Sequence, residues 1–134
     1  MTPRHIETLP VRVESDLLLV RQLVRACAIE LGFNSFLQTR IVTAASELGR
    51  NTLTHGGGGS LQIERVAASG RRGLRLTFDD QGPGIPDLAL AMTDGYTTMG
   101  GMGLGLGGSK RLVSELEIDS RPGAGTRITA TQWT

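Results

Sequence analysis

A carboxylate and a carboxamide stand four residues apart in this sequence, and together they could do chemistry. Glu47 and Asn51 have the spacing of one helix face, beside an apolar stripe rather than opposite it. Such a pair could supply a general base and an oxygen ligand for a hard cation such as Mg²⁺. The same spacing is common on solvated helix faces, so the pair alone leaves both interpretations open.

Two consecutive acids stand where a strand-like segment ends, in the run Asp79-Asp80-Gln81-Gly82-Pro83-Gly84. Gly82 and Gly84 would let the backbone approach a flat ligand while a carboxylate accepts a hydrogen bond from it. A plain turn explains the same residues. This segment is therefore a candidate binding site or a turn.

Seven of the fourteen residues from 95 to 108 are glycine, so we expect a mobile loop there. The loop contains the pattern G-x-G-x-x-G but lacks the preceding strand and the βαβ unit of a dinucleotide site. No Gly-Lys pair of a Walker loop occurs, and the motifs of eukaryotic-type kinases are missing. Two interpretations remain: a surface loop without order, or a glycine-rich lid that opens a helix, whose N–H groups could hold phosphates.

The elements that must position these residues follow from hydrophobic spacing and turn chemistry. We expect an edge strand at 6–13, a helix capped by Ser15 and closed by Gly32, and a second helix from Ser35 to about Thr54. Further strands are expected at 61–68, 74–80, 116–120 and 126–133, a helix at 109–115 and a short helical stretch after residue 87. The order predicts an α+β fold, a two-layer sandwich with helices on one face of a mixed, mostly antiparallel sheet. The other face should be at least partly exposed, which suits a partner protein.

Composition excludes several classes of function. The chain has 134 residues, with 14 Lys and Arg against 13 Asp and Glu, so its net charge is +1. We expect one domain over residues 1–134, with no electrostatic footprint for nucleic acid or an anionic membrane. No window approaches the ~20 apolar residues of a membrane span. The single Cys27 fits a reducing compartment, so we expect a cytoplasmic protein.

Four segments together resemble the boxes of the GHKL (Bergerat-fold) ATPases. S-E-L-G-R-N-T-L-T-H-G at 46–56 is similar to their N box, E-x-x-x-N with a downstream His-Gly, and D-Q-G-P-G at 80–84 is similar to their adenine box. G-M-G-L-G-L-G at 101–107 is similar to their glycine lid, and G-A-G-T at 123–126 to their last box. The resemblance implies a histidine-kinase-like ATPase fold that binds ATP and Mg²⁺.

The resemblance also implies a role for each matched residue. Asp80 would accept a hydrogen bond from the adenine amino group, Gly82 and Gly84 would let the ring approach, and Thr126 would support it. Asn51 would hold Mg²⁺, and Glu47 would orient or deprotonate the incoming serine hydroxyl. The phosphates would meet the lid glycines and the first cation after them: Gly101, Gly103, Gly105, Gly107 and Lys110. His55 is expected to be a residue of the helix cap rather than a catalyst.

Within this superfamily the chain resembles the small bacterial switch kinases and anti-sigma factors, and among them the stressosome serine kinases. Anti-sigma members usually carry a basic residue just before the lid, whereas residues 94–109 contain no Lys or Arg, which favours the switch-kinase branch. The resemblance implies a serine kinase that phosphorylates a STAS-domain antagonist, is released, and activates a PP2C-type phosphatase. One alternative is an anti-sigma kinase that sequesters a sigma factor. Another is a nucleotide-gated binding module without significant kinase activity, and a homodimer stays open.

Overall fold

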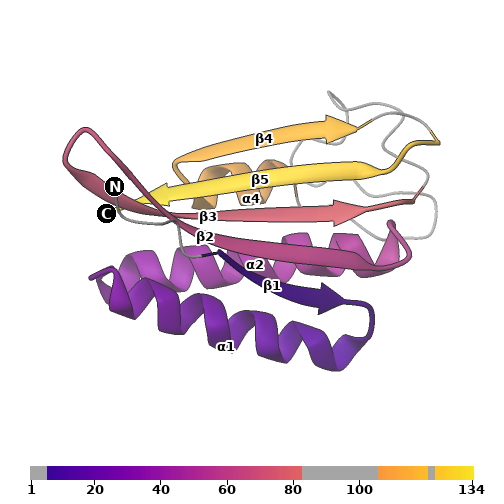
Figure 1. The fold of residues 1–134 in the computed structure, drawn as a ribbon, viewed down its shortest axis with the longest axis horizontal. Helices are drawn as coiled ribbons and strands as arrows, with labels where there is room; N and C mark the ends of the chain where they lie inside the picture. The colour runs from indigo at the N-terminus through magenta and orange to yellow at the C-terminus, as the bar shows by residue number, and fades with distance from the viewer. Residues whose placement is uncertain (1–5, 83–105, 121–122) are drawn as a thin grey trace.

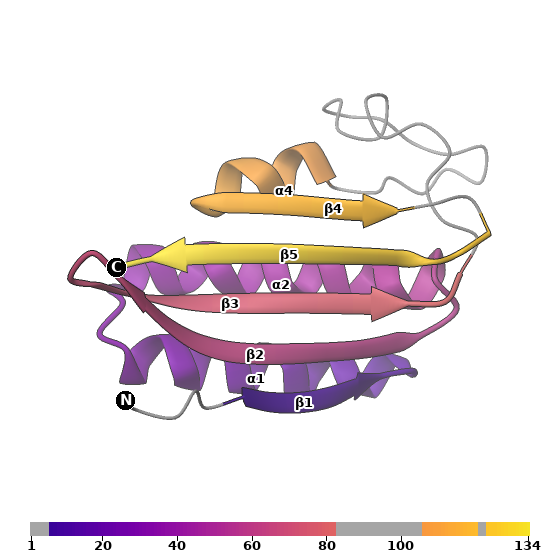
Figure 2. The same cartoon turned by 45° about the horizontal axis from the view of Figure 1, so that its top comes forward.

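The computed structural model describes residues 6–82, 106–120 and 123–134 (Figure 1). The elements follow the expected order: β1 (Ile6–Val11), α1 (Glu14–Glu30), α2 (Ser35–Thr54), β2 (Gly59–Ala68), β3 (Arg71–Asp80), α4 (Leu106–Leu112), β4 (Glu115–Ser120) and β5 (Thr126–Trp133). The strands form one sheet in the order β1-β2-β3-β5-β4, in which every described pair is antiparallel (Figure 2). The predicted fold class is therefore confirmed.

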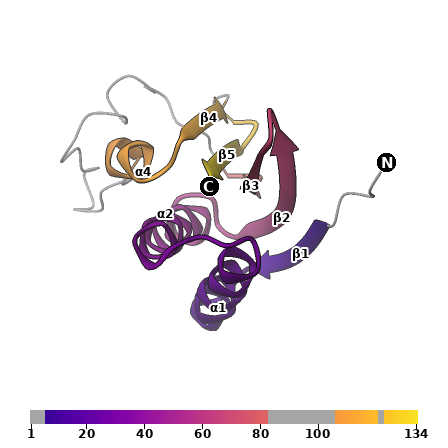
Figure 3. The ribbon, with the colours of Figure 1, turned by 90° about the vertical axis from the view of Figure 1, so that its left-hand side faces the viewer.

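The three described helices lie on the same side of the sheet (Figure 3). Alternation along β3 shows why: Leu74, Leu76 and Phe78 are buried beneath the helices, whereas Arg75 and Thr77 between them are only half-buried. The helices supply the matching apolar stripes of the core, namely Leu17, Val20 and Val24 in α1 and Ile41, Ala44, Ala45 and Leu48 in α2. The opposite face of the sheet is polar, as expected.

The helix caps differ from those predicted. α1 begins at Glu14 rather than after Ser15, and the Asp16 carboxylate accepts hydrogen bonds from the N–H groups of Arg12 and Val13 at 2.9 and 3.1 Å. α2 is capped by Asn34 rather than Ser35, because the Asn34 side chain accepts from the Leu37 N–H at 2.8 Å. Each shift is one or two residues and leaves the buried stripe in place.

The hairpin between β2 and β3 is tighter than predicted. Its turn is the pair Ser69-Gly70 alone, with φ angles of 52° and 77°, the left-handed geometry that suits the twist of two-residue hairpins. Arg71 and Arg72, expected in the turn, instead pair with Ala68 and Ala67. Both strands are therefore longer than their apolar runs indicate.

α4 begins earlier and ends earlier than predicted. It covers Leu106–Leu112, so Gly107 and Gly108 are helical, and Glu115 is the first residue of β4. A helical glycine costs about 1 kcal/mol relative to alanine, but α4 also gains tertiary support. Ser109 is buried, and the Arg40 guanidinium of α2 donates to the Arg111 carbonyl. The rest of the predicted glycine loop and the short helix after residue 87 lie outside the described residues.

No described helix is both long and apolar enough to cross a membrane.

Candidate functional site

One end of each described strand and the C-terminal end of α2 meet at one end of the molecule, on the right of Figure 1. The sheet register explains this meeting, because Asp80, the last residue of β3, pairs with Gly59 of β2 on one side and with Thr126 of β5 on the other. Ser120, the last residue of β4, pairs with Thr126 in the same row. The adenine-box acid and the last-box threonine are thus adjacent, as the resemblance implies.

The Asp80 side chain is held by backbone donors. Its carboxylate accepts from the Gly82 N–H at 2.9 Å and from the Thr126 N–H. Burial raises the pKa of Asp80 above its usual value, and these two hydrogen bonds oppose the rise. Asp79 raises the pKa further, whereas His55 opposes it. A carboxylate fixed in this way is an acceptor of defined direction.

Glycines crowd around Asp80. A Cβ at Gly56 would overlap the Asp80 side chain, and a Cβ at Gly125 would overlap the Asp80 carbonyl oxygen. A Cβ at Gly82 would lie 2.6 Å from the Cα of Gly56. Gly82 therefore packs against Gly56, and Gly56, the last residue of the segment similar to the N box, lies against Asp80.

Glu47 and Asn51 share a face of α2 but differ in exposure. Asn51 is buried, with 8% of its surface exposed. Its backbone carbonyl accepts hydrogen bonds from the N–H groups of His55 and Gly56 at 2.9 and 3.2 Å. Glu47 is exposed, and it makes no hydrogen bond or ion pair with any other residue that the structure describes. The pair thus combines an inward amide with an accessible carboxylate.

Two hollows border Asp80. One, of about 300 Å³, has Gly125, Thr126 and Arg127 in its wall, and the other, of about 470 Å³, is lined by Arg12, Gly56–Gly59 and Ser60. The donor set fits the ligands that the family implies: the Asp80 carboxylate can accept from the amino group of a planar base, and the Asn51 carboxamide oxygen suits Mg²⁺. No described group of three His, Cys, Asp or Glu residues could hold a metal by itself.

The remaining predicted residues are partly described. Thr126 is buried, and its hydroxyl shares a 2.9 Å hydrogen bond with the Ser120 hydroxyl. Lys110 is exposed on α4, and Gly107 lies in the first turn of that helix. The other predicted glycines lie outside the described residues: Gly84, Gly101, Gly103 and Gly105.

His55 caps the C-terminal end of α2, as expected, but its ring adds a feature that sequence reasoning missed. The Nε2 atom is buried, with no hydrogen-bond partner among the described groups. Burial lowers the pKa of His55, and nearby Asp80 opposes the shift. The imidazole is therefore neutral at neutral pH. The His-Gly dipeptide was the available signal, although it does not indicate which ring atom is buried.

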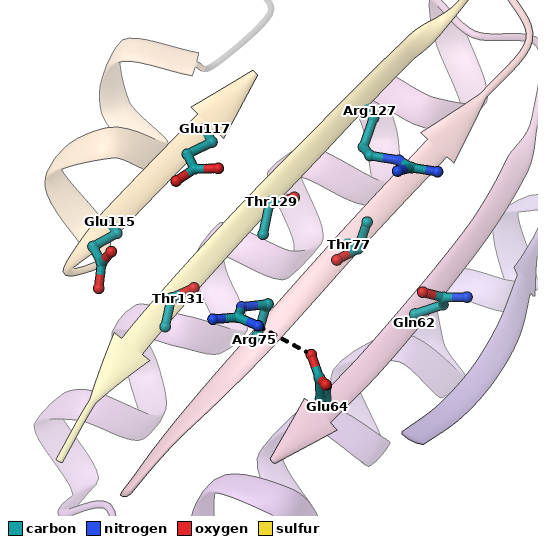
Figure 4. Close-up of a pocket in the computed structure, with 9 residues that line it drawn as sticks. All are labelled: Gln62, Glu64, Arg75, Thr77, Glu115, Glu117, Arg127, Thr129 and Thr131. Atoms are coloured by element: carbon teal, nitrogen blue, oxygen red, sulfur yellow. Dashed lines mark hydrogen bonds and ion pairs between the residues drawn. The ribbon is translucent and has the colours of Figure 1, made fainter. Parts of the chain in front are cut away.

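A third hollow lies on the open face of the sheet, away from the strand ends (Figure 4). It measures about 370 Å³ and contains none of the predicted site residues. Its wall is polar and includes an ion pair between Arg75 and Glu64 at 3.3 Å. Of the residues that line it, only Arg127 also lines a hollow beside Asp80.

Comparison with known families identifies the family to which the chain belongs. Residues 37–133 match the family described as histidine kinase-, DNA gyrase B-, and HSP90-like ATPase. The chain belongs to this ATPase family. The matched range contains Glu47, Asn51, Asp80 and Thr126, so the predicted resemblance to the GHKL ATPases is confirmed.

Two curated relatives indicate a branch of the family. The chain is 48% identical over 123 residues to the serine/threonine-protein kinase RsbT of Bacillus subtilis (strain 168), covering 92% of each protein. It is 33% identical over 98 residues to the anti-sigma F factor of Thermoanaerobacter sp. (strain X514), covering 69% of this chain and 68% of that one. Both kinds of relative agree with the branch that the motifs indicate.

Solved structures support the same fold. The RsbU and RsbW domains of Rv1364c from Mycobacterium tuberculosis superpose with a TM-score of 0.65 at 26% identity, covering 98% of this chain and 32% of that one. The histidine kinase domain of the blue-light activated histidine kinase of Erythrobacter litoralis EL346 gives a TM-score of 0.53 at 21% identity, covering 92% and 60%. The second likeness shows the fold alone.

Proposed function

We propose that this protein is an ATP- and Mg²⁺-dependent protein serine kinase that works as a partner-switching regulator. The observation that carries the proposal is the 48% identity to a serine/threonine-protein kinase over 92% of both chains. The motif residues that the structure describes support it, because Asp80 and Thr126 lie side by side at one end of the sheet.

Asp80 recognises the adenine. Its carboxylate, oriented by the N–H groups of Gly82 and Thr126, accepts a hydrogen bond from the exocyclic amino group of the base. The Thr126 hydroxyl, held by Ser120, supports the same edge of the ring. A half-buried acceptor of this kind discriminates between bases, because a base without the amino group leaves it unpaired.

Asn51 and the glycine segment serve the phosphates. Asn51 would hold Mg²⁺, which neutralises the charge of the phosphate groups when bound. Gly101, Gly103, Gly105 and Gly107 would cover the triphosphate with backbone N–H groups, and Lys110 is the first cation of the chain after them. Phosphoryl transfer depends mainly on positioning and charge neutralisation, so this small set of groups is sufficient.

Glu47 acts on the protein substrate. The serine oxygen attacks the γ-phosphorus, the bond from that phosphorus to the bridging oxygen of ADP breaks, and the hydroxyl proton passes to the Glu47 carboxylate. The exposure of Glu47 supports this role, because a serine on another protein can reach an exposed side chain. Its position one helical turn from Asn51 keeps acid and amide on the same face.

The partners follow from the branch of the family. The substrate serine lies on a small STAS-domain antagonist, and the released kinase docks on a PP2C-type phosphatase and activates it. The resemblance to the stressosome switch kinases supports both partners, and the lone Cys27 supports a cytoplasmic location.

The test is a labelling experiment. The protein is mixed with ATP, Mg²⁺ and the STAS-domain protein encoded beside it, and phosphoserine is measured for wild type and for Glu47→Gln. We expect labelling by wild type only, with ATP bound by both proteins. Arg50→Gln is the matched control, because Arg50 is on the exposed side of the same helix and pairs with Glu14. Equal labelling by wild type and Glu47→Gln would remove Glu47 from the mechanism.

A second candidate function rests on the 33% identity to an anti-sigma F factor. In that case the protein sequesters a sigma factor and phosphorylates its anti-anti-sigma partner, the protein that opposes this sequestration. Pull-down with purified sigma factor and purified PP2C-type phosphatase separates the two functions, because a switch kinase retains only the phosphatase. Nucleotide-dependent capture of either partner without any phosphoserine would identify a nucleotide-gated binding module instead.

A further inference from the structure

Gly56 directly follows the histidine that caps α2, and it is a glycine for reasons of space alone. Its φ lies outside the left-handed region, in contrast to those of Gly57 and Gly58 at 72° and 102°. The backbone at Gly56 would therefore accept alanine. The obstacle is Asp80: a Cβ at Gly56 would overlap the Asp80 Cγ and lie 2.5 Å from both Cβ and Oδ2 of that residue. No real Cβ atom tolerates such contacts, so one of the two residues must move.

Asp80 has little freedom to move. Asp80 is the last residue of β3 and pairs with residues of β2 and β5. Gly125 lies so close to the Asp80 carbonyl oxygen that a Cβ at position 125 would overlap it. Its carboxylate is held by the N–H groups of Gly82 and Thr126. Gly82 in turn packs on Gly56, since a Cβ there would lie 2.6 Å from the Gly56 Cα. Any side chain at position 56 therefore turns the carboxylate away from these donors.

We propose that Gly56 is a positioning residue that sets the base specificity of the nucleotide site. Because it lacks a Cβ, it leaves open the one orientation in which the Asp80 carboxylate both keeps its backbone donors and can accept from the amino group of adenine. The inference rests on the proposed function, in which Asp80 reads that group. It adds a specificity determinant just after the C-terminal cap of α2, a helix whose Glu47 and Asn51 serve the phosphoryl transfer and the metal in the proposed function.

The experiment compares two nucleotides that differ at one group. Calorimetry in the presence of Mg²⁺ measures dissociation constants for ATP and for purine riboside triphosphate, which lacks the 6-amino group. Wild type should prefer ATP by about tenfold, the value of one hydrogen bond to a charged, half-buried acceptor. Both Asp80→Asn and Gly56→Ala should abolish the preference, so that the two dissociation constants become about equal, because in each variant the oriented carboxylate is lost. The double variant should show no lower preference than Asp80→Asn alone, because both changes act on the same bond.

Gly49→Ala is the matched control. It adds the same methyl group to α2, where the new Cβ would lie 2.8 Å from the flexible Leu17 side chain and away from Asp80. It should lower thermal stability while keeping the tenfold preference for ATP. This control separates a displaced carboxylate from a merely loosened fold, because loosening weakens the binding of both nucleotides equally.

The possible outcomes separate a failure of this inference from a failure of the proposed function on which it rests. If wild type binds neither nucleotide, the proposed function fails. If wild type and Asp80→Asn behave as expected but Gly56→Ala keeps its preference for ATP, the inference alone is overturned. If Gly56→Ala does not fold, the swap Gly56→Ala/Asp80→Gly should restore a cooperative melting transition, because it removes the overlapping atoms. A swap that stays unfolded would show that Gly56 does not act through Asp80.

Discussion

Gly56 and Gly59, at one end of the sheet, serve a different purpose from Gly70 at the other end. At the end that carries Asp80, a Cβ at Gly56 or Gly59 would overlap Asp80 or the Asp79 carbonyl, although neither glycine has a left-handed φ. At the opposite end, Gly70 has a φ of 77° and open space around its Cα. Gly56 and Gly59 are therefore required for close approach, whereas Gly70 is required for its conformation.

The largest effect is expected where both requirements coincide, at Gly125. Gly125→Ala must adopt a φ of 86° and also overlap the Asp80 carbonyl oxygen. We expect a loss of about 3 kcal/mol or more in the free energy of unfolding, the sum of overpacking and left-handed strain. Urea denaturation followed by circular dichroism measures it. A loss no larger than that of Gly70→Ala would abolish the distinction between the two ends.

The next effect concerns ligand binding. Asp80→Asn should weaken ATP binding by roughly 5- to 150-fold, because the base loses a charged acceptor worth ~1–3 kcal/mol. Calorimetry with ATP and Mg²⁺ measures the change. The control lies at the hairpin end, where Arg71 stacks over the Trp133 ring at 5.0 Å. Arg71→Ala should leave ATP affinity unchanged, and an equal loss in both variants would remove Asp80 from the site.

A smaller effect is expected at the hairpin turn. Gly70→Ala should cost about 1 kcal/mol of unfolding free energy, because only the left-handed φ is unfavourable and no atom lies near the new Cβ. ATP affinity should not change. Chemical denaturation and calorimetry on the same preparation test both statements, and a weakened ATP affinity would mean that the two ends are coupled.

The smallest effect is a pH dependence that originates at His55. Burial lowers the pKa of His55 from 6.5, so the folded protein binds this proton less readily than the unfolded chain does. The corresponding stability is complete above pH 6.5 and is lost as the pH falls through the lowered value. Between pH 7.5 and 5.5 the melting temperature of wild type should therefore fall more than that of His55→Gln.

The control for this measurement is built into the comparison. The raised pKa of Asp80 has the opposite sign, because the folded state then binds the proton more tightly, and this contribution is present in both proteins. The part of it that does not depend on His55 cancels in the difference between wild type and variant, and the part due to the interaction between His55 and Asp80 belongs to the measured effect. Parallel melting curves across the whole pH range would show that the His55 ring titrates as in the unfolded chain.

The sequence predicts most of the fold because burial has a period. The spacing of Leu17, Val20 and Val24 can be satisfied only by a helix with one inner face, and that helix is present. Helix caps are harder to predict, because several neighbouring polar residues can accept a hydrogen bond from the first turn. In α2 the cap is Asn34 rather than Ser35. The helical Gly107 was also missed, since its cost is offset by contacts between α4 and α2 that local sequence does not contain.

The features of the candidate site also divide into those that local spacing predicts and those that depend on the tertiary structure. The helical spacing of Glu47 and Asn51 is local, so their common face could be predicted, whereas the burial of one and the exposure of the other could not. The need for glycine at position 56 depends on Asp80, which is distant along the chain and comes close only when β3 passes the end of α2. A family motif records such a glycine without giving its reason. The physical explanation requires the tertiary structure.

The place of β5 in the sheet has a consequence for how the protein is made. β5 lies between β3 and β4, although it is synthesised after both. A nascent chain that has not yet released β5 from the ribosome therefore leaves β4 without its partner and β3 with an open edge, which invites pairing with other chains. The same chain lacks the Thr126 N–H that helps to hold Asp80. In the proposed function, Asp80 can therefore recognise a base only after this strand is translated, and we expect products that end before β5 not to bind ATP.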